Sequence, residues 1–382
     1  MKRKILASLV ACLILFFGSW NWSEAQTEEQ TQEMEAAWFG DSVKVMTRNV
    51  YIGADVDPIL EAPFEEIPFM VAQLYKDMLL TDFRVRAKAL AKEIAQYKPH
   101  LVGLQEITYI YVEIGSSGEE WNYLEILLSE LNSLCPGMYD VPYFGEPAIN
   151  KNIEIMLPLY DLETGAEGFV YVEDYDVILA RNDVSVTDVA TKDYSTVLIV
   201  PTPEPYDDII VGRGYVSVDA QVGSKAYRFV NTHLEPYKID GIFPYFQIEQ
   251  AKELIADLEN ETLPIITVGD YNTLAPIGIV YLMMRAAGYE DAWCHNRLKW
   301  NIFGFTSPHD ADLRNKWPKL YQRIDLIFVR NQAGIGGSRI GPVYAIVVGD
   351  QRRDRIYFPP TGEKIWPSDH AGVVAQLRMP VF

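Results

Sequence analysis

The chain is poor in cysteine and in basic residues. Its 382 residues include three Cys, too few for a disulfide scaffold, and no Cys-x-x-Cys or Cys/His cluster of the kind that binds structural zinc. Lys and Arg number 33 against 53 Asp and Glu, so the net charge is −20. This balance argues against a surface that holds nucleic acid by many phosphate contacts, because such a surface needs clustered Lys and Arg. A nucleic-acid enzyme that uses metal ions and a few local arginines remains open.

Several common catalytic signatures are also absent. The chain has no Gly-Lys-Ser/Thr phosphate loop, no His-Glu-x-x-His pair and no Gly-x-Ser-x-Gly elbow. The segment 212–217 begins like a dinucleotide-binding loop, but β-like sequence follows it where a helix is required. None of these four mechanisms therefore has its signature here.

The longest apolar run is too short for a transmembrane helix, which needs about 20 apolar residues. Residues 2–4 are basic, the 13 residues Ile5–Phe17 are apolar except for one serine, and 23–25 offer small residues at a cleavage site. We therefore expect 1–25 to be a signal peptide whose removal leaves a secreted or cell-envelope protein without a transmembrane domain. An uncleaved anchor, or a lipoprotein modified at Cys12, is the alternative.

The mature chain is expected to begin with a polar linker at 26–40, with the folded part following at 41–382. Two cysteines remain after signal removal, Cys135 and Cys294. In an oxidising compartment they could pair, and the sequence leaves this open.

Strand-like and helix-like segments alternate along the rest of the chain. Helical spacing of apolar residues predicts helices at Asp82–Tyr97, Trp121–Leu134, Gln247–Leu258 and Ile277–Ala287. Strands are predicted at Val43–Thr47, Leu101–Leu104, Val177–Ala180, Tyr215–Ala220, Tyr227–Asn231, Ile265–Val268, Ile324–Val329 and Val343–Val348. Strands outnumber helices and several are joined by short turns, which favours packed β-sheets with helices outside them. The Pro-rich segment 201–205 is predicted to be a hairpin loop.

Polar groups cluster where the predicted apolar strands begin or end. They are Asn49, Glu106, His233, Asp270, Asn272, Asp325, Asp369 and His370. Each alone has an ordinary interpretation, such as a turn former, a helix cap or a buried histidine. Six strand termini with such groups need a common cause, and strand ends can converge at one rim of a sheet. Oxygen and nitrogen groups of this kind hold hydrated Mg²⁺ or Mn²⁺.

The ordered series of short segments resembles the endonuclease/exonuclease/phosphatase superfamily of metal-dependent hydrolases. The matching segments are Met46–Val50, Leu104–Glu106, Asn231–Leu234, Gly269–Asn272, Arg323–Asp325 and Ser368–His370. The resemblance implies an α/β fold, a four-layer α/β/β/α sandwich of two packed mixed β-sheets flanked by helices. It also implies that 41–382 is one catalytic domain, and the opening segment looks most like bacterial exported members of undefined substrate.

The resemblance also implies roles for the site residues. Glu106 and Asp369 would bind the metal, with Asn49 orienting metal-bound water or a phosphate oxygen and Asp270 activating water or binding metal. Mg²⁺ or Mn²⁺ is the expected cofactor, with Ca²⁺ as a further candidate.

The remaining implied roles concern the substrate and the proton. His370 would be the general base or a phosphate contact, with its ring oriented by Asp325. His233 would contact the phosphate or the leaving group, and Asn272 would hold phosphate. Arg213 precedes a predicted strand and is either a fixed positive charge at the substrate or a solvated hairpin residue.

The substrate class stays open among phosphate esters of small molecules, lipid head groups and nucleic acid. Tyr51 occupies the position where the abasic-site nuclease branch carries an aspartate, which weakens an assignment to that branch. The acidic composition favours a phosphodiesterase over a DNase-like endonuclease, with sphingomyelinase- or phospholipase C-like activity as another alternative. A non-enzymatic surface-binding protein on the same scaffold is the remaining option. We expect a monomer with no stable nucleic-acid scaffold.

Overall fold

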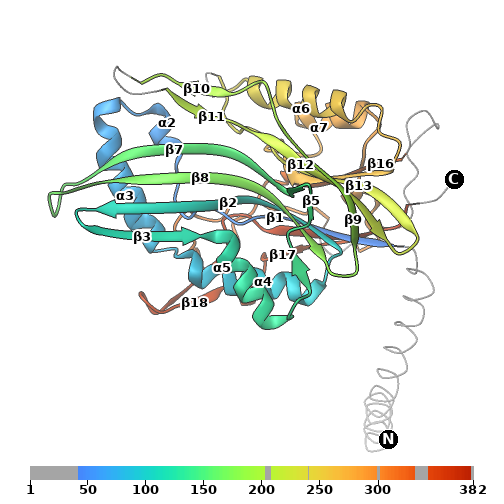
Figure 1. Cartoon of the computed structure of the whole chain (residues 1–382), viewed down its shortest axis with the longest axis horizontal. Coiled ribbons are helices and arrows are strands. Elements are labelled where there is room, and N and C mark those ends of the chain that lie inside the picture. The colour runs from blue at the N-terminus through green and yellow to red at the C-terminus, as the bar shows by residue number, and fades with distance from the viewer. Residues whose placement is uncertain (1–41, 203–207, 240, 299–301, 332–342, 380–382) are drawn as a thin grey trace, which may run out of the picture. The chain divides into compact units, whose positions relative to one another are not determined.

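The computed structural model describes residues 42–379 except for 203–207, 240, 299–301 and 332–342 (Figure 1). The predicted signal peptide 1–25 and linker 26–40 therefore lie outside the described residues. From Val43 onwards the described chain belongs to one compact unit. None of its described helices has the length and apolar character needed to cross a membrane.

The first of two large sheets has eight strands. They are β1 (Val43–Asn49), β2 (Leu101–Ile114), β3 (Ser117–Asn122), β4 (Tyr139–Asp140), β7 (Ile149–Asp161), β8 (Ala166–Arg181), β17 (Tyr344–Val348) and β20 (Gly372–Leu377). The main path runs β17-β20-β1-β2-β8-β4, with β3 paired to β2 and β7 paired to β8. Only β1 and β2 run parallel in the described pairs, so the sheet is mixed.

The second sheet has six strands in the order β15-β16-β14-β13-β12-β9. They are β9 (Ser185–Asp193), β12 (Gly214–Val222), β13 (Lys225–His233), β14 (Ile265–Asp270), β15 (Glu290–Asp291) and β16 (Asp325–Arg330). Here β13 and β14 are the parallel pair. Three small antiparallel pairs complete the strands: β5 (Tyr143–Phe144) with β6 (Glu146–Pro147), β10 (Leu198–Val200) with β11 (Ile209–Val211), and β18 (Ile356–Phe358) with β19 (Glu363–Ile365).

Two of the described helices begin where a polar side chain caps the first turn. The Asp82 carboxylate accepts a hydrogen bond from the Arg84 N–H at 2.9 Å, and Asn122 accepts one from the Glu125 N–H at 3.2 Å. The described helices are α2 (Asp57–Glu61), α3 (Ile67–Leu79), α4 (Phe83–Tyr97), α5 (Tyr123–Leu134), α6 (Tyr245–Asp257) and α7 (Ile279–Ala286). Short 3₁₀ turns occupy Phe64–Glu66, Ala292–His295 and Arg352–Asp354.

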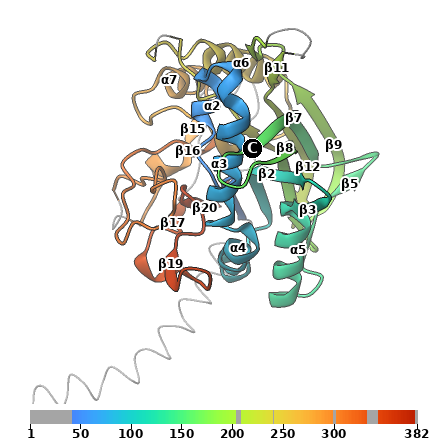
Figure 2. The same ribbon diagram turned by 90° about the vertical axis from the view of Figure 1, so that its left-hand side faces the viewer.

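Three apolar clusters define four layers. Val45 of the first sheet and Phe229 and Ile266 of the second belong to one cluster, which fills the space between the sheets. A second cluster joins α4 and α5 to the outer face of the first sheet, and a third joins α6 and α7 to the outer face of the second. Figures 1 and 2 show the two sheets with helices on either side. The predicted four-layer α/β/β/α sandwich is confirmed.

Two elements are much longer than the sequence predicts. Strand β2 continues ten residues beyond Leu104, and β8 begins eleven residues before Val177. Strand β7 and helices α2 and α3 are not predicted at all. Apolar and polar residues alternate in these long strands, so they lack the continuous apolar runs by which the other strands were identified. The helix predicted from Trp121 begins at Tyr123, because 121 and 122 belong to β3.

The structure also bears on the predicted proline-rich loop and on the two cysteines of the mature chain. Strands β10 and β11, on either side of the predicted hairpin loop 201–205 in the sequence, pair antiparallel, and residues 203–205 themselves lie outside the described residues. Cys135 and Cys294 are both free, the first buried and the second exposed.

A buried polar bridge joins the two sheets next to their strand ends. The Asn231 side chain on β13 donates hydrogen bonds to the carbonyl oxygens of Leu104 (2.8 Å) and Val177 (3.1 Å) on the first sheet. It accepts one from Gln105 Nε2 at 2.6 Å. Close approach of the sheets depends on Gly103, since a Cβ there would lie 2.6 Å from Asn231 Oδ1. This bridge fixes how the ends of β2 and β13 face each other.

Replacing Asn231 by Leu is expected to lower the free energy of unfolding by about 2–4 kcal/mol, because two carbonyl groups and the Gln105 amide lose buried partners. Denaturant unfolding measures the change, and Asn260→Ala in an exposed turn is the control. A loss no larger than that of the control would show that the bridge is not a stabilising contact.

Candidate active site

Strand register brings three of the predicted residues into a row. His233 ends β13 and pairs with Asp270 at the end of the parallel strand β14. Asp270 pairs in turn with Asp325, the first residue of the antiparallel strand β16. All three side chains are almost fully buried. The polar groups at these strand ends therefore converge at one rim of the second sheet.

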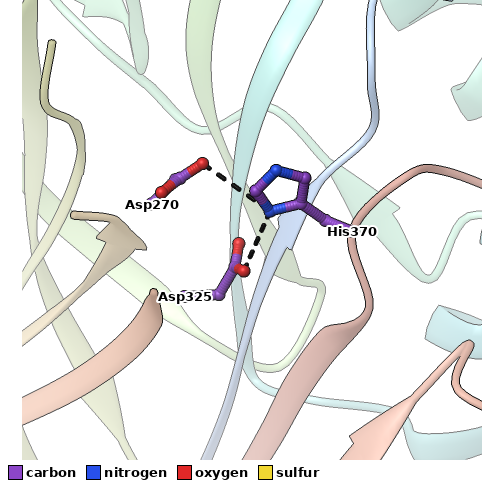
Figure 3. A group of neighbouring side chains, drawn as sticks. All are labelled: Asp270, Asp325 and His370. Atoms are coloured by element: carbon purple, nitrogen blue, oxygen red, sulfur yellow. Dashed lines mark hydrogen bonds and ion pairs between the residues drawn. The ribbon is translucent and has the colours of Figure 1, made fainter. Parts of the chain in front are cut away.

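His370 completes this group from the other sheet, two residues before β20 begins. Its Nδ1 lies 2.9 Å from Asp325 Oδ2 and 3.6 Å from Asp270 Oδ2 (Figure 3). A carboxylate can only accept a hydrogen bond, so Nδ1 carries a proton and donates a hydrogen bond to Asp325. Asp325 thus orients the ring, and Nε2 is the ring nitrogen left for chemistry.

The charges in this group shift one another's pKa values. Burial alone would disfavour a charged imidazole, but Asp325, Asp369 and Asp270 raise the pKa of His370 well above its ordinary value. Burial, reinforced by the negative charge of Asp325, raises the pKa of Asp270 to about 7. His370 and Asp270 therefore each bind a proton more tightly than the isolated side chain would.

Glu106 reaches the site because the strand that carries it is distorted. Pairing of β2 with β8 is interrupted between Leu104 and Ile107, and Glu106 adopts a left-handed φ of 58°. Bulges of this kind redirect side chains near active sites. The Glu106 carboxylate accepts hydrogen bonds from Asn49 Nδ2 at 2.8 Å and from the Ile52 N–H at 2.9 Å.

Asn49 links this carboxylate to the histidine cluster. Its Nδ2 also donates to Asp270 Oδ2 at 3.2 Å, so one amide group holds two carboxylates. Its Oδ1 accepts a hydrogen bond from the Tyr51 N–H at 2.9 Å, which fixes the orientation of the amide. In this arrangement Asn49 positions Glu106 and Asp270 relative to each other.

The oxygen groups fit a divalent cation. Glu106 and Asp369 line the same cavity. Burial raises the pKa of Asp369 to about 6, with the negative charge of Glu106 acting in the same direction. A cation relieves repulsion between carboxylates, and carboxylate oxygens without thiolates are the donor set that Mg²⁺ and Mn²⁺ prefer.

One ligand atom each of Asp270, Asp325 and His370 also lie within 4.8 Å of one another, which is close enough to share an ion. However, His370 Nδ1 and Asp325 Oδ2 are already hydrogen-bonded to each other. Glu106 and Asp369, which line the same cavity, are therefore the carboxylates that could hold a cation beside this cluster.

Arg213 is a fixed charge, and its interpretation as a solvated hairpin residue is wrong. It is 9% exposed, donates from Nε to Glu235 Oε2 at 3.1 Å, and places a guanidinium nitrogen 3.2 Å from His233 Nδ1. Because arginine stays protonated, His233 Nδ1 accepts this bond and Nε2 keeps the ring proton. Burial, together with Arg213, lowers the pKa of His233 far below its ordinary value. His233 is therefore a neutral hydrogen-bond donor.

Asn272 lies beside the same histidine. It has a left-handed φ of 48°, and its backbone N–H donates to Asp270 Oδ1 at 2.9 Å. Its side-chain amide donates to the Leu234 carbonyl oxygen at 2.8 Å and lies 3.2 Å from His233 Nε2. The structure thus places all nine predicted residues in or next to one site.

Two buried acids near the site were not predicted. Glu235 forms the ion pair with Arg213, and its position two residues after His233 is a signal that could have revealed it. Asp174 lies 3.9 Å from Arg213 in the middle of β8. No sequence feature marks Asp174, because it occupies an ordinary position of an alternating strand.

Several solved structures are similar to this chain. TDP2 from Caenorhabditis elegans is 16% identical, with a TM-score of 0.48 over 98% of this chain and 86% of its own. An endonuclease/exonuclease/phosphatase family protein from Leptotrichia buccalis is 15% identical, with a TM-score of 0.49 over 88% and 100%. The mannosyl-6-phosphatase of Bacteroides thetaiotaomicron is 17% identical, with a TM-score of 0.47 over 89% and 100%.

A search of curated proteins finds no match. The model of the endonuclease/exonuclease/phosphatase family, in contrast, matches residues 79–370, about three quarters of the chain. The matched range includes every predicted site residue except Asn49. The chain therefore belongs to the endonuclease/exonuclease/phosphatase family and is a hydrolase that acts on phosphate esters.

Proposed function

We propose that the protein is an exported phosphodiesterase that depends on a divalent cation. The observation that carries this proposal is the hydrogen-bonded chain Glu106–Asn49–Asp270, which ends 3.6 Å from the oriented ring of His370. This chain links Glu106, a proposed cation ligand, to Asp270 and His370, the proposed proton-transfer groups. Export is proposed from the basic, apolar and small-residue pattern of residues 1–25.

In the proposed reaction, a water oxygen forms a bond to phosphorus while the bond from phosphorus to the alcohol oxygen breaks. The water gives its proton to Asp270, and the departing oxygen takes one from His370 Nε2. His233 Nε2–H and Asn272 hydrogen-bond the phosphoryl oxygens. A divalent cation held by Glu106 and Asp369 would neutralise the charge of the transferring phosphoryl group.

A panel of phosphate esters tests this proposal. With Mg²⁺ or Mn²⁺ we expect hydrolysis of bis-p-nitrophenyl phosphate, no turnover after removal of the metal by a chelator, and recovery when metal is added back. The same panel includes p-nitrophenyl phosphate, plasmid DNA, RNA, sphingomyelin and phosphatidylcholine.

Each contrary outcome of the panel has a definite meaning. Unchanged turnover after exhaustive chelation would contradict the metal mechanism. Faster cleavage of p-nitrophenyl phosphate than of the diester would make the protein a phosphomonoesterase. Faster cleavage of DNA or RNA than of every small ester would make it a nuclease.

A further inference from the structure

A cavity of about 670 Å³ begins at the proposed cation site. Its polar end includes Glu106, Asp369 and Arg213. Most of the remaining lining consists of aliphatic side chains from separate segments of the chain. The volume falls within the roughly 300–1,000 Å³ of sites that bind small organic molecules. The cavity therefore has space for more than a phosphoryl group.

The lining changes from polar to apolar along the strands that lead away from the site. On β8 the residues that face the cavity are Asp174, Val172 and Val170, in that order from the site. Residues two apart on a strand share a face, so one strand supplies both parts of the wall. The lining changes in the same way along the segment that begins with β11, where polar Arg213 lies near the site and apolar Val211 and Ile209 lie further away.

Apolar residues also form the other walls. Strand β7 contributes Ile153, Ile155 and Leu157, and α3 contributes Val71, Leu74 and Met78. Figures 1 and 2 show α2 and α3 alongside the long β7–β8 hairpin, and α3 contacts β7. Strand β7 and helices α2 and α3, which the sequence did not predict, thus help to enclose this apolar space.

The chemistry of these walls selects the occupant. A sugar or a nucleobase in this space would lose water from its polar groups without gaining hydrogen-bond partners from aliphatic walls, which is costly. An aliphatic chain has no polar group to desolvate and gains from burial. Because the same cavity contains Glu106 and Asp369, a phosphate at the cation site and a chain attached to it can bind together.

We propose that the substrate is a phosphodiester of an aliphatic alcohol, whose hydrocarbon chain lies in this cavity while its phosphate lies at Glu106 and Asp369. The inference rests on the proposed function, since it assigns the substrate of the same site. The occupant of the cavity and of the cation site is a single amphiphilic molecule. A polynucleotide or a sugar phosphate would not use the apolar walls.

A chain-length series tests the proposal. The substrates are p-nitrophenyl alkyl phosphodiesters from methyl to dodecyl, each assayed below its critical micelle concentration with Mg²⁺ or Mn²⁺. We expect kcat/KM to rise about three- to four-fold for each added methylene over the first several carbons, and then to level off when the cavity is filled.

Two variants on adjacent residues of β7 locate the effect. Ile155 faces the cavity, whereas Met156 is on the opposite face of the strand and is 65% exposed. Ile155→Trp fills the space and should flatten the chain-length series while the methyl ester is still hydrolysed. Met156→Trp adds the same side chain outside the cavity and should keep the wild-type slope.

The outcomes separate this inference from the proposed function. Turnover of the methyl ester with no rise along the series would overturn the inference and leave the phosphodiesterase intact. An equal slope in wild type and both variants would also overturn it, because the chain would then bind elsewhere. If no ester is hydrolysed, the proposed function fails.

Calorimetric titration with dodecyl phosphate and methyl phosphate then tests whether the cavity binds an alkyl chain. The dodecyl compound should bind at least about 100-fold more tightly, and equal affinities would refute the cavity assignment.

Discussion

Asp270→Asn and His370→Ala are each expected to lower kcat by about 10²–10⁴, the range for the loss of a positioned acid or base. Asp270 Oδ2 and His370 Nδ1 lie 3.6 Å apart, and Asp325 holds the histidine ring in place. Asparagine keeps the shape of Asp270 but cannot accept a proton from water. Alanine at 370 removes both the ring and its Nε2. Both effects should appear in kcat at saturating metal and substrate.

The double variant Asp270→Asn/His370→Ala should be little worse than the poorer single variant, because groups that act in one chemical step are not additive. Steady-state kinetics of the four proteins measures this. Asp257→Asn, at the exposed end of α6, is the control for loss of an aspartate elsewhere. Circular dichroism should show that all variants fold.

Two results would contradict the assignment. Single variants that keep more than about a third of the wild-type kcat would show that these groups do not carry proton transfer, since that falls far short of the expected range. Fully additive losses would show that Asp270 and His370 act in separate steps. In either case the strand-end groups would have to be interpreted as structural.

Glu106→Gln is expected to weaken binding of Mg²⁺ or Mn²⁺ by at least about 10- to 100-fold, as loss of a group at a metal site commonly does. The neutral amide removes one negative charge from the ligand set. In wild type, Oε1 accepts from Asn49 Nδ2 and Oε2 from the Ile52 N–H, and glutamine replaces one of these two oxygens by a nitrogen that cannot accept. Activity should fall steeply at limiting metal, and excess metal should restore part of it.

Calorimetric metal titration measures this effect without reference to turnover. Glu113→Gln, on the same strand seven residues further on, is the matched control and should bind metal as the wild type does. A Glu106→Gln protein with wild-type metal affinity would show that Glu106 is not a ligand. Lost activity with unchanged affinity would instead give Glu106 a role in the chemistry alone.

The sequence alone predicts which polar side chains lie at a rim of the sheet. A short apolar run such as Ile265–Val268 forms a buried strand wherever it lies, so the polar residue that follows it reaches a rim of the sheet. This rule predicts that Asp270 and His233 lie at the rim, and Asp325 reaches it because it begins an antiparallel strand. Their convergence follows from the register of adjacent strands, and the family resemblance supplied the order in which the segments occur.

Only the tertiary structure decided how these groups act. The left-handed conformation of Glu106 results from a bulge in β2 where it pairs with β8. The burial of the Arg213 guanidinium depends on its ion pair with Glu235, which lies 22 residues further along the chain. The apolar cavity is formed by β2, β7, β8, the segment around β11, α2 and α3, which are distant in sequence and individually unremarkable. Local patterns determine which side chains are buried in a strand, but the shape of the space between strands depends on packing among distant segments. The sequence therefore determined which polar groups reach the rim of the sheet, and the tertiary structure determined their contacts and the cavity beside them.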